Sequence, residues 1–152
     1  MSATRSDLEG LRSRFIPQLV EHARSRGVIS GNATKGWTVR KTVAPGVQMI
    51  YVIRSRLARV EMWIYHGSSD DEVESAGGLF NQFTAKKQEI ERAYGGPLNW
   101  SHTGRKTAFS IQQDYLDFDL RQEGRWKDWT ERMVSDMHRL DSALLPYYKS
   151  TR

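Results

Sequence analysis

Residues 47–66, VQMIYVIRSRLARVEMWIYH, decide the fold of this chain. The first part, 47–54, is apolar at nearly every position, which predicts a strand that is buried on both faces in the centre of a sheet. In the second part, 57–66, apolar residues alternate with polar and aromatic ones, as in a strand with one buried face. Ser55 and Arg56 leave room only for a tight reversal. The stretch therefore predicts two antiparallel neighbours.

Three further strands are predicted around this pair. Residues 37–43 alternate in the same way and lead into 47–54 through an Ala-Pro-Gly turn, because proline sets φ and glycine accepts a positive φ. These three consecutive segments indicate a meander. Residues 98–101 and 107–113 add two short strands, so that we expect a sheet of about five strands.

Amphipathic patterns predict three helices, over 6–27, 74–94 and 126–146. We expect Ser6 to cap the first helix and Pro17 to kink or split it. The last helix has the clearest stripe, with spacings of three or four between Trp126, Trp129, Met133, Met137, Leu140 and Leu144. The prediction is one α+β domain over 1–152, with helices packed on an antiparallel sheet in the order α-β-β-β-α-β-β-α.

Composition excludes several kinds of site. The chain has no cysteine, which excludes disulfides, a cysteine nucleophile and thiolate metal centres. Residues 1–11 carry charges and lack the apolar run of a signal peptide, and no stretch approaches the roughly 20 apolar residues of a membrane span. We therefore expect a cytoplasmic protein that binds no membrane and no cofactor.

Charge is divided unevenly along the chain. Residues 1–60 hold eleven Lys and Arg against three Asp and Glu, a net charge of +8, whereas 61–152 hold twelve against fifteen, a net of −3. Many of the basic residues fall on the predicted strands and turns. With an aromatic ring, Trp37 or Trp63, available for stacking, they are the predicted nucleic-acid-binding residues: Lys35, Trp37, Arg40, Lys41, Arg54, Arg56, Arg59, Arg105 and Lys106. The alternative is a sheet face that these side chains merely keep soluble.

No catalytic or metal-binding residues are predicted. A nuclease site needs two carboxylates for Mg²⁺ and a lysine, but the segment Glu61-Met62-Trp63 has tryptophan where that lysine belongs. Glu61, beside Arg59, is instead interpreted as one half of a cross-strand charge pair on a solvated face. The acids of 114–123 do not follow calcium-loop spacing, and the four histidines are scattered. A divergent metal-dependent nuclease remains an alternative.

Aromatic residues outnumber what one small core needs. Those counted as surplus are Trp63, Tyr65, Trp126, Trp129, Tyr147 and Tyr148. An exposed patch of such side chains would mark a protein interface. The second alternative is therefore a protein-interaction or homodimerisation module that binds no nucleic acid.

Three segments, 57–66 (LARVEMWIYH), 79–100 (LFNQFTAKKQEIERAYGGPLNW) and 126–148 (WKDWTERMVSDMHRLDSALLPYY), carry a family resemblance. The chain resembles an uncharacterised bacterial and archaeal family, formally a domain of unknown function. Many of its members are fused behind a restriction-endonuclease-like PD-(D/E)XK domain, which this chain lacks. The resemblance implies a nuclease-associated or phage-defence setting, with a nuclease or another defence protein as partner, and it assigns no residue a role. The leading hypothesis is a non-catalytic binding or accessory module that contacts DNA, RNA or such a partner through a basic sheet surface.

Overall fold

A computed structural model describes residues 5–28, 32–33, 38–65, 70–102 and 108–148. Its helices are α1 (Arg5–Ser25), α2 (Asp70–Ala85), α3 (Lys87–Tyr94), a short 3-10 turn η1 (Glu123–Arg125) and α4 (Trp126–Tyr148). Its strands are β1 (Asn32–Ala33), β2 (Thr38–Ala44), β3 (Val47–Ile53), β4 (Ala58–Tyr65), β5 (Asn99–His102) and β6 (Ala108–Tyr115). The predicted α+β class and element order are confirmed.

The strands form one antiparallel sheet in the order β1-β2-β3-β4-β6-β5. Strands β2, β3 and β4 are the predicted meander, and β3 is the predicted central strand, with six of its seven residues buried. Strand β6 pairs with β4 along its whole length. This pairing brings residues about fifty positions apart in the sequence side by side.

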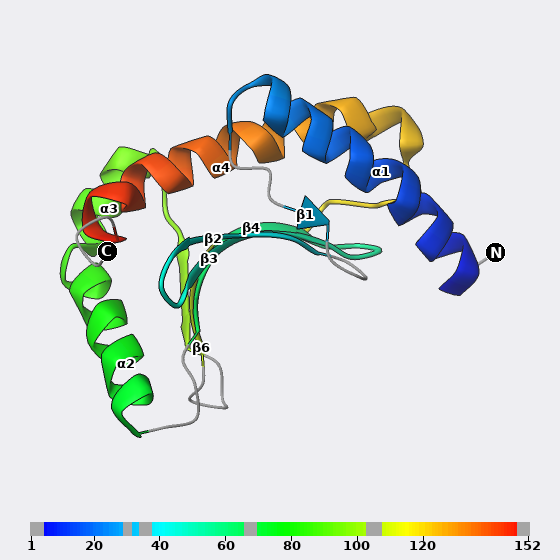
Figure 1. Cartoon of the computed structure of the whole chain (residues 1–152). Coiled ribbons are helices and arrows are strands. Elements are labelled where there is room, and N and C mark those ends of the chain that lie inside the picture. The colour runs from blue at the N-terminus through cyan, green and yellow to red at the C-terminus, as the bar shows by residue number, and fades with distance from the viewer. Residues whose placement is uncertain (1–4, 29–31, 34–37, 66–69, 103–107, 149–152) are drawn as a thin grey trace.

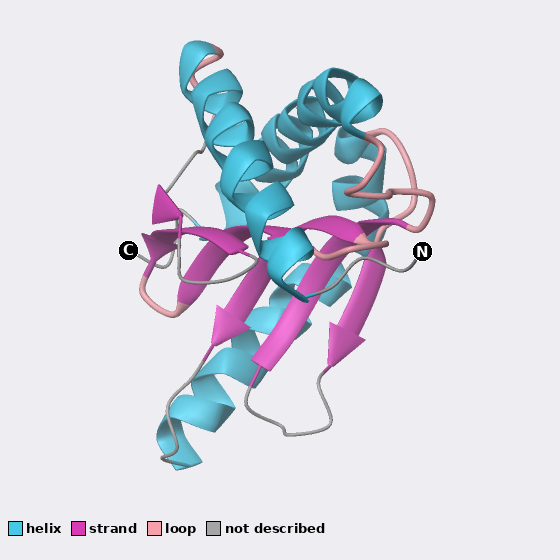
Figure 2. Cartoon of the chain, turned by 90° about the vertical axis from the view of Figure 1, so that its right-hand side faces the viewer, coloured by secondary structure: helices cyan, strands magenta, loops and turns pink. Residues whose placement is uncertain are grey.

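All the helices lie on the convex side of the strongly curved sheet. Figure 1 shows α4 across the top of the sheet and α2 beside its descending half, with the inner side of the curve left open. In Figure 2 the lower halves of the long strands face the viewer without a helix in front of them, and α2 lies behind. The sheet therefore has one face packed against helices and one concave face that none of the described helices covers.

The core lies between the helices and the convex face. The stripe predicted for the last helix is confirmed, since all six of its residues are buried in α4. Phe15 and Leu19 of α1 are fully buried beside it, and the Phe15 ring meets Trp126 edge-on with centroids 5.4 Å apart. Each fully buried side chain of this size contributes about 1.5–3 kcal/mol. This core fixes which sheet face is left for solvent.

The number of helices differs from the prediction. The helix predicted over 74–94 is two helices, because the backbone turns at Lys86 (φ −109°, ψ 20°). Phe83 and Ile90, on either side of the turn, are both fully buried. The break lets α2 and α3 follow the curved sheet (Figure 1), and neither glycine nor proline stands at the turn to reveal it in the sequence.

Two prolines and a serine also behave differently from the prediction. Helix α1 continues through Pro17 and α4 continues two residues past Pro146. Burial of the side chains around Pro17 offsets the cost of about 3 kcal/mol for an internal proline. Ser6 lies inside α1, which begins at Arg5, and not at its cap. Asn32 and Ala33, outside all the predicted strands, pair with β2 as strand β1.

Candidate functional site

The concave face of the sheet carries most of the chemistry of this protein. Side chains alternate between the two faces of a strand, and paired residues of neighbouring antiparallel strands share a face. The registers therefore assign one set to the open side. This set, the concave face, consists of Thr38, Arg40, Thr42, Gln48, Ile50, Val52, Arg59, Glu61, Trp63, Asn99, Ser101, Ser110, Gln112 and Asp114.

A hollow of about 370 Å³ lies on this face. Its floor is apolar, because Ile50 and Val52 point away from the helices and belong to no part of the main core, yet expose only 1% and 5% of their surface. Its other lining side chains are larger and mostly charged. We call it the arginine hollow; it is lined by Thr38, Arg40, Ile50, Val52, Arg54, Arg59, Glu61 and Trp63.

Arg40 is held in a defined position over this floor. Its Nε donates to Thr38 Oγ1 at 3.1 Å and its Nη1 donates to Gln48 Oε1 at 3.3 Å. Its guanidinium carbon lies 5.0 Å from the centroid of the Trp63 ring, a cation–π contact. These bonds use two of the five N–H groups of a guanidinium. A planar cation thus lies against an aromatic ring inside the hollow.

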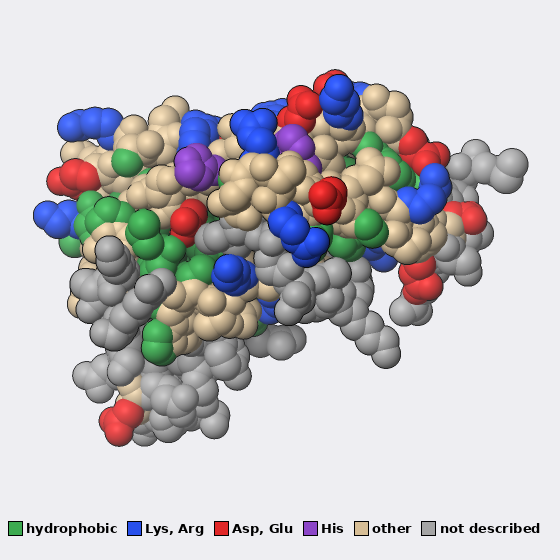
Figure 3. Space-filling view, turned by 45° about the horizontal axis from the view of Figure 1, so that its top comes forward, with side chains coloured by type: hydrophobic (Ala, Val, Ile, Leu, Met, Phe, Trp, Pro, Cys, Tyr) green, Lys and Arg blue, Asp and Glu red, His purple; other side chains and the backbone are tan. Residues whose placement is uncertain are grey.

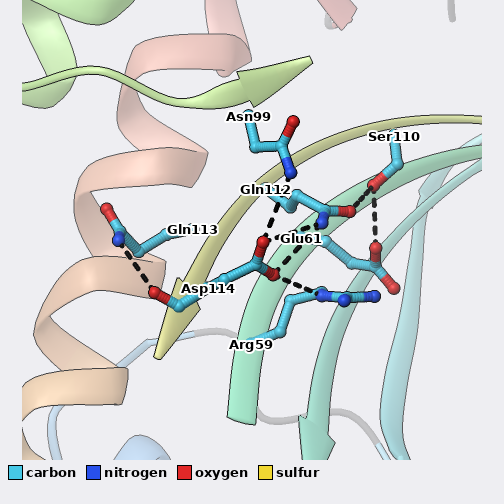
Figure 4. A network of polar contacts seen from close by, with 7 residues as sticks. All are labelled: Arg59, Glu61, Asn99, Ser110, Gln112, Gln113 and Asp114. Carbon is cyan, nitrogen blue, oxygen red and sulfur yellow. Dashed lines mark hydrogen bonds and ion pairs between the residues drawn. The ribbon is translucent and has the colours of Figure 1, made fainter. Parts of the chain in front are cut away.

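A chain of polar contacts crosses strands β4 and β6 beside the hollow (Figure 4). Arg59 Nε donates to Asp114 Oδ1 at 2.6 Å, and Gln112 Nε2 lies 3.1 and 3.2 Å from the two oxygens of the same carboxylate. Ser110 Oγ lies 2.7 Å from Gln112 Oε1 and 2.8 Å from Glu61 Oε2. Arg59 and Glu61 are thus linked through three residues of β6.

The two acids of this chain have opposite pKa shifts. Burial raises the pKa of Glu61, whose residue is only 9% exposed, against the opposing hydrogen bond with Ser110 and the charges of Arg59 and Arg40. Partial burial acts in the same upward direction on Asp114. Hydrogen bonds from Arg59, Asn99 and Gln112, together with the Arg59 charge, outweigh it and lower the pKa of Asp114. Arg59 is therefore balanced mainly by Asp114.

Of the nine predicted nucleic-acid-binding residues, the structure brings three together. Arg40, Arg54 and Arg59 line the arginine hollow. Lys41 is exposed but pairs with Met49, a core residue of the helix-packed face, so it lies on the wrong side of β2. Arg56 is exposed in the bend after β3, where its charge acts on Asp119. Lys35, Trp37, Arg105 and Lys106 lie outside the described residues.

The interpretation of Glu61 is wrong in that this residue is buried rather than solvated. The cross-strand ion pair beside it joins Arg59 of β4 to Asp114 of β6. A signal for this network does exist in the sequence, since Ser110, Gln112 and Asp114 are polar at every second position and mark a polar strand face. The partner of that face could not be predicted, because the pairing of β4 with β6 was unknown.

Most of the surplus aromatics are inside the protein. Trp126, Trp129 and Tyr148 belong to α4 and are buried, and Tyr147 packs partly against the core. Trp63 is half-buried on the concave face. The side chain of Tyr65 is not among those described. The homodimer and nuclease alternatives both stay predictions.

The described residues contain neither a metal-binding cluster nor a membrane-spanning helix. Within them, no three Asp, Glu or His side chains gather in a way that could hold a metal ion. None of the described helices is both long and apolar enough to cross a membrane.

Comparisons with known proteins identify a family and include a distant structural likeness. A family model described as "Domain of unknown function (DUF4268)" matches residues 11–148. The solved structure of YbjN from E. coli is 8% identical, with a TM-score of 0.38 over 86% of this chain and 93% of that one. This likeness is too weak to bear on function. No curated protein matches the chain.

Proposed function

This chain belongs to the DUF4268 family, and we propose that it is a non-catalytic binding module that contacts single-stranded nucleic acid through the arginine hollow of its concave face. The observation that carries the proposal is the convergence of Arg40, Arg54 and Arg59 with Trp63 around one hollow on an open sheet. These residues come from three successive strand segments. Their convergence is a property of the folded sheet and not of one basic stretch.

The chemistry of the hollow suits a nucleotide. Guanidinium groups match phosphate oxygens with paired donors, which supports a polyanionic ligand. Bases stack on aromatic rings and on guanidinium planes, and Arg40 against Trp63 offers both surfaces together. Single strands are preferred in the proposal because only they present unpaired base faces.

The two sides of the molecule differ in charge pattern. On the helical side, shown in Figure 3, basic and acidic side chains are interspersed. In the arginine hollow three arginines stand against one acid, Glu61, and the neighbouring Asp114 balances Arg59. The lining therefore carries more positive than negative side chains. The hollow is therefore the favoured place for phosphates.

Setting and partner belong to the same proposal. We infer a nuclease-associated or phage-defence role in the cytoplasm, acting on DNA or RNA together with a nuclease or other defence protein. Its support is the resemblance carried by 57–66, 79–100 and 126–148. Co-purification of the tagged chain with a PD-(D/E)XK nuclease from its own cells would support this part. Purification with no nuclease or defence protein would count against it without touching the hollow.

Fluorescence anisotropy tests the binding role. A labelled oligothymidylate of about 12 nucleotides is titrated at low salt, a length within the usual range for one binding domain. Arg40→Ala and Arg54→Ala should each weaken binding about tenfold, because each removes a charge-assisted contact. The control is Arg92→Ala, which removes an equal charge from an exposed position on α3 and should leave the affinity unchanged.

The salt dependence provides a second measure from the same titrations. For single strands, log K falls by about 0.7 for each phosphate neutralised per unit of log salt concentration. Arg59 is already engaged with Asp114, so contacts from Arg40 and Arg54 predict a slope of about −1.4, and each hollow variant should reduce its magnitude by about 0.7. A flat isotherm for the wild type, or equal losses in Arg92→Ala and the hollow variants, would refute the proposed function.

A further inference from the structure

The polar chain beside the arginine hollow has a fixed number of hydrogens. Ser110 Oγ is 2.7 Å from Gln112 Oε1 and 2.8 Å from Glu61 Oε2, and both distances are those of O–H···O hydrogen bonds. A serine hydroxyl has one hydrogen, so it can donate to only one of these two oxygens. In the other contact, the partner oxygen must carry a hydrogen and donate it to Ser110 Oγ. Otherwise two oxygens would lie in contact with no hydrogen between them.

Gln112 cannot provide that hydrogen. Its Nε2 lies against both oxygens of Asp114, and a flipped amide would place a carbonyl oxygen there against a carboxylate that only accepts. Asp114 is ionised because Arg59 donates to it at 2.6 Å. Gln112 Oε1 must therefore face Ser110 and accept its hydrogen.

The remaining contact, between Ser110 and Glu61, then requires a hydrogen on Glu61 itself. We propose that Glu61 is a neutral carboxylic acid in the folded protein at neutral pH, donating to Ser110 Oγ, and that a polyanion binds the arginine hollow more tightly while Glu61 keeps this proton. The second half rests on the proposed function. The proposed ligand is a phosphate-bearing anion, and pH regulates its binding through the proton on Glu61.

Charged groups around Glu61 act in both directions. Arg59 on the same strand and Arg40 on β2 favour the carboxylate, whereas Asp114 on β6 opposes it; from β5, the next strand, the concave face presents Asn99 and Ser101, which are uncharged. Burial is the largest influence and raises the pKa of Glu61, over the opposing effects of a hydrogen bond with Ser110 and of the two arginine charges. Arg59 is also engaged with Asp114, which weakens its support for a second anion. The direction agrees with the hydrogen count.

Protonation of Glu61 changes the charge of the hollow. Glu61 adds one negative charge to the lining of the hollow when it is ionised and none when it is neutral, so the net charge of the lining falls by one as Glu61 ionises. A bound phosphate near the arginines of the hollow also disfavours a second negative charge on Glu61. Binding of the anion must therefore be linked to proton uptake, and affinity must fall as Glu61 ionises.

The experiment measures the proton and the affinity separately. The side-chain ¹³C shift of Glu61 in labelled wild-type protein is followed by NMR from about pH 4 to about pH 9, a range that brackets the ordinary glutamate pKa. Affinity for the labelled oligothymidylate is measured over the same range in wild type, Glu61→Gln and Glu131→Gln. Glutamine keeps a donor toward Ser110 and mimics the neutral acid, while Glu131 is an exposed acid on α4 and serves as the matched control.

The expected result has three parts. The Glu61 midpoint lies well above the ordinary glutamate value, and wild-type affinity falls about three- to tenfold through the same midpoint, the size of one partly screened charge. Glu61→Gln loses this fall and keeps the tight affinity at high pH. Glu131→Gln follows the wild type.

Each contrary result has its own meaning. A Glu61 midpoint at the ordinary glutamate value overturns the neutral acid, and this measurement needs no variant to fold. A raised midpoint with equal pH profiles in wild type and Glu61→Gln overturns the coupling to binding. If no protein binds oligothymidylate at any pH, the proposed function and the coupling both fail, while the NMR midpoint still decides the protonation of Glu61.

Discussion

Arg40 on β2 and Trp63 on β4 meet across the intervening strand β3, with the guanidinium carbon 5.0 Å from the ring centroid. Antiparallel registers on both sides of β3 place them on the same face, one on each side of Ile50 and Gln48. The contact spans the open face of the sheet and joins the two chemical components of the proposed site, a cation and an aromatic surface.

Trp63→Ala should weaken binding of oligothymidylate about tenfold, because stacking of a base on an aromatic ring is worth about 1–3 kcal/mol. Trp100→Ala is the matched control, since Trp100 is also half-buried but its neighbours in the register lie on the helix-packed face. Both variants lose packing, and circular dichroism confirms that each is folded before titration. Equal losses of affinity in the two variants would remove Trp63 from the site.

Asp114→Asn should lower the free energy of unfolding by about 1–3 kcal/mol at neutral pH, because Arg59 loses its partner in a partly buried ion pair. The pKa of Asp114 is lowered in the folded protein. Its contribution is therefore present above the unfolded pKa of about 4 and is lost as pH falls through the folded pKa. Urea unfolding at about pH 7 and in steps below about pH 4 measures the difference between wild type and variant. A difference that stays constant in acid would contradict the assignment.

Glu61→Gln should have the opposite pH dependence. The pKa of Glu61 is raised in the folded protein, so its contribution to stability is present below the unfolded pKa and declines as pH rises through the folded pKa. The variant cannot ionise at this position and avoids this decline. Its stability relative to the wild type should therefore be higher at about pH 8 than at about pH 4. Urea unfolding at both pH values checks this, with Glu131→Gln as the control. A wild type that gains on the variant as pH rises would contradict it.

Gly95→Ala should destabilise the end of α3 by about 1–2 kcal/mol. Gly95 has φ +98°, and an added Cβ would lie 3.0 Å from Arg139 Nη1, which donates to Tyr94 O at 2.6 Å. Gly96→Ala is the control, because an added Cβ there meets no atom within 4 Å. Thermal unfolding of the two variants measures the contrast. Equal melting temperatures for both would show that neither the left-handed backbone nor Arg139 constrains this site.

Local patterns predicted the buried residues correctly where the spacing of apolar residues within one element determines which of its side chains are buried. Trp129 and Met133 are buried in α4 because their helical spacing makes a single apolar stripe, whatever that stripe packs on. Strand β3 is central because it is apolar at both alternating positions. The break at Lys86 was not predicted, because it follows from the curvature of the sheet and no local glycine or proline marks it.

The charge asymmetry of the sequence predicted a larger basic surface than the fold forms. The basic first sixty residues do not form one surface, since Arg14 and Arg24 lie on α1, where they pair with Glu123 and Glu21. Arg40 and Lys41 are adjacent in the chain but point to opposite faces. Only tertiary packing shows which face the helices cover, and therefore which of the two can line a site.

The sequence by itself determined the elements, the central strand and the buried helix stripe, because each depends on periodicity within one segment. Tertiary structure alone decided that Glu61 meets Ser110, forty-nine positions away, and that three arginines share one hollow. The reason is the register between β4 and β6, which no local pattern encodes. A slip of one residue would turn Ser110 and Asp114 to the opposite face and separate Glu61 from its partner.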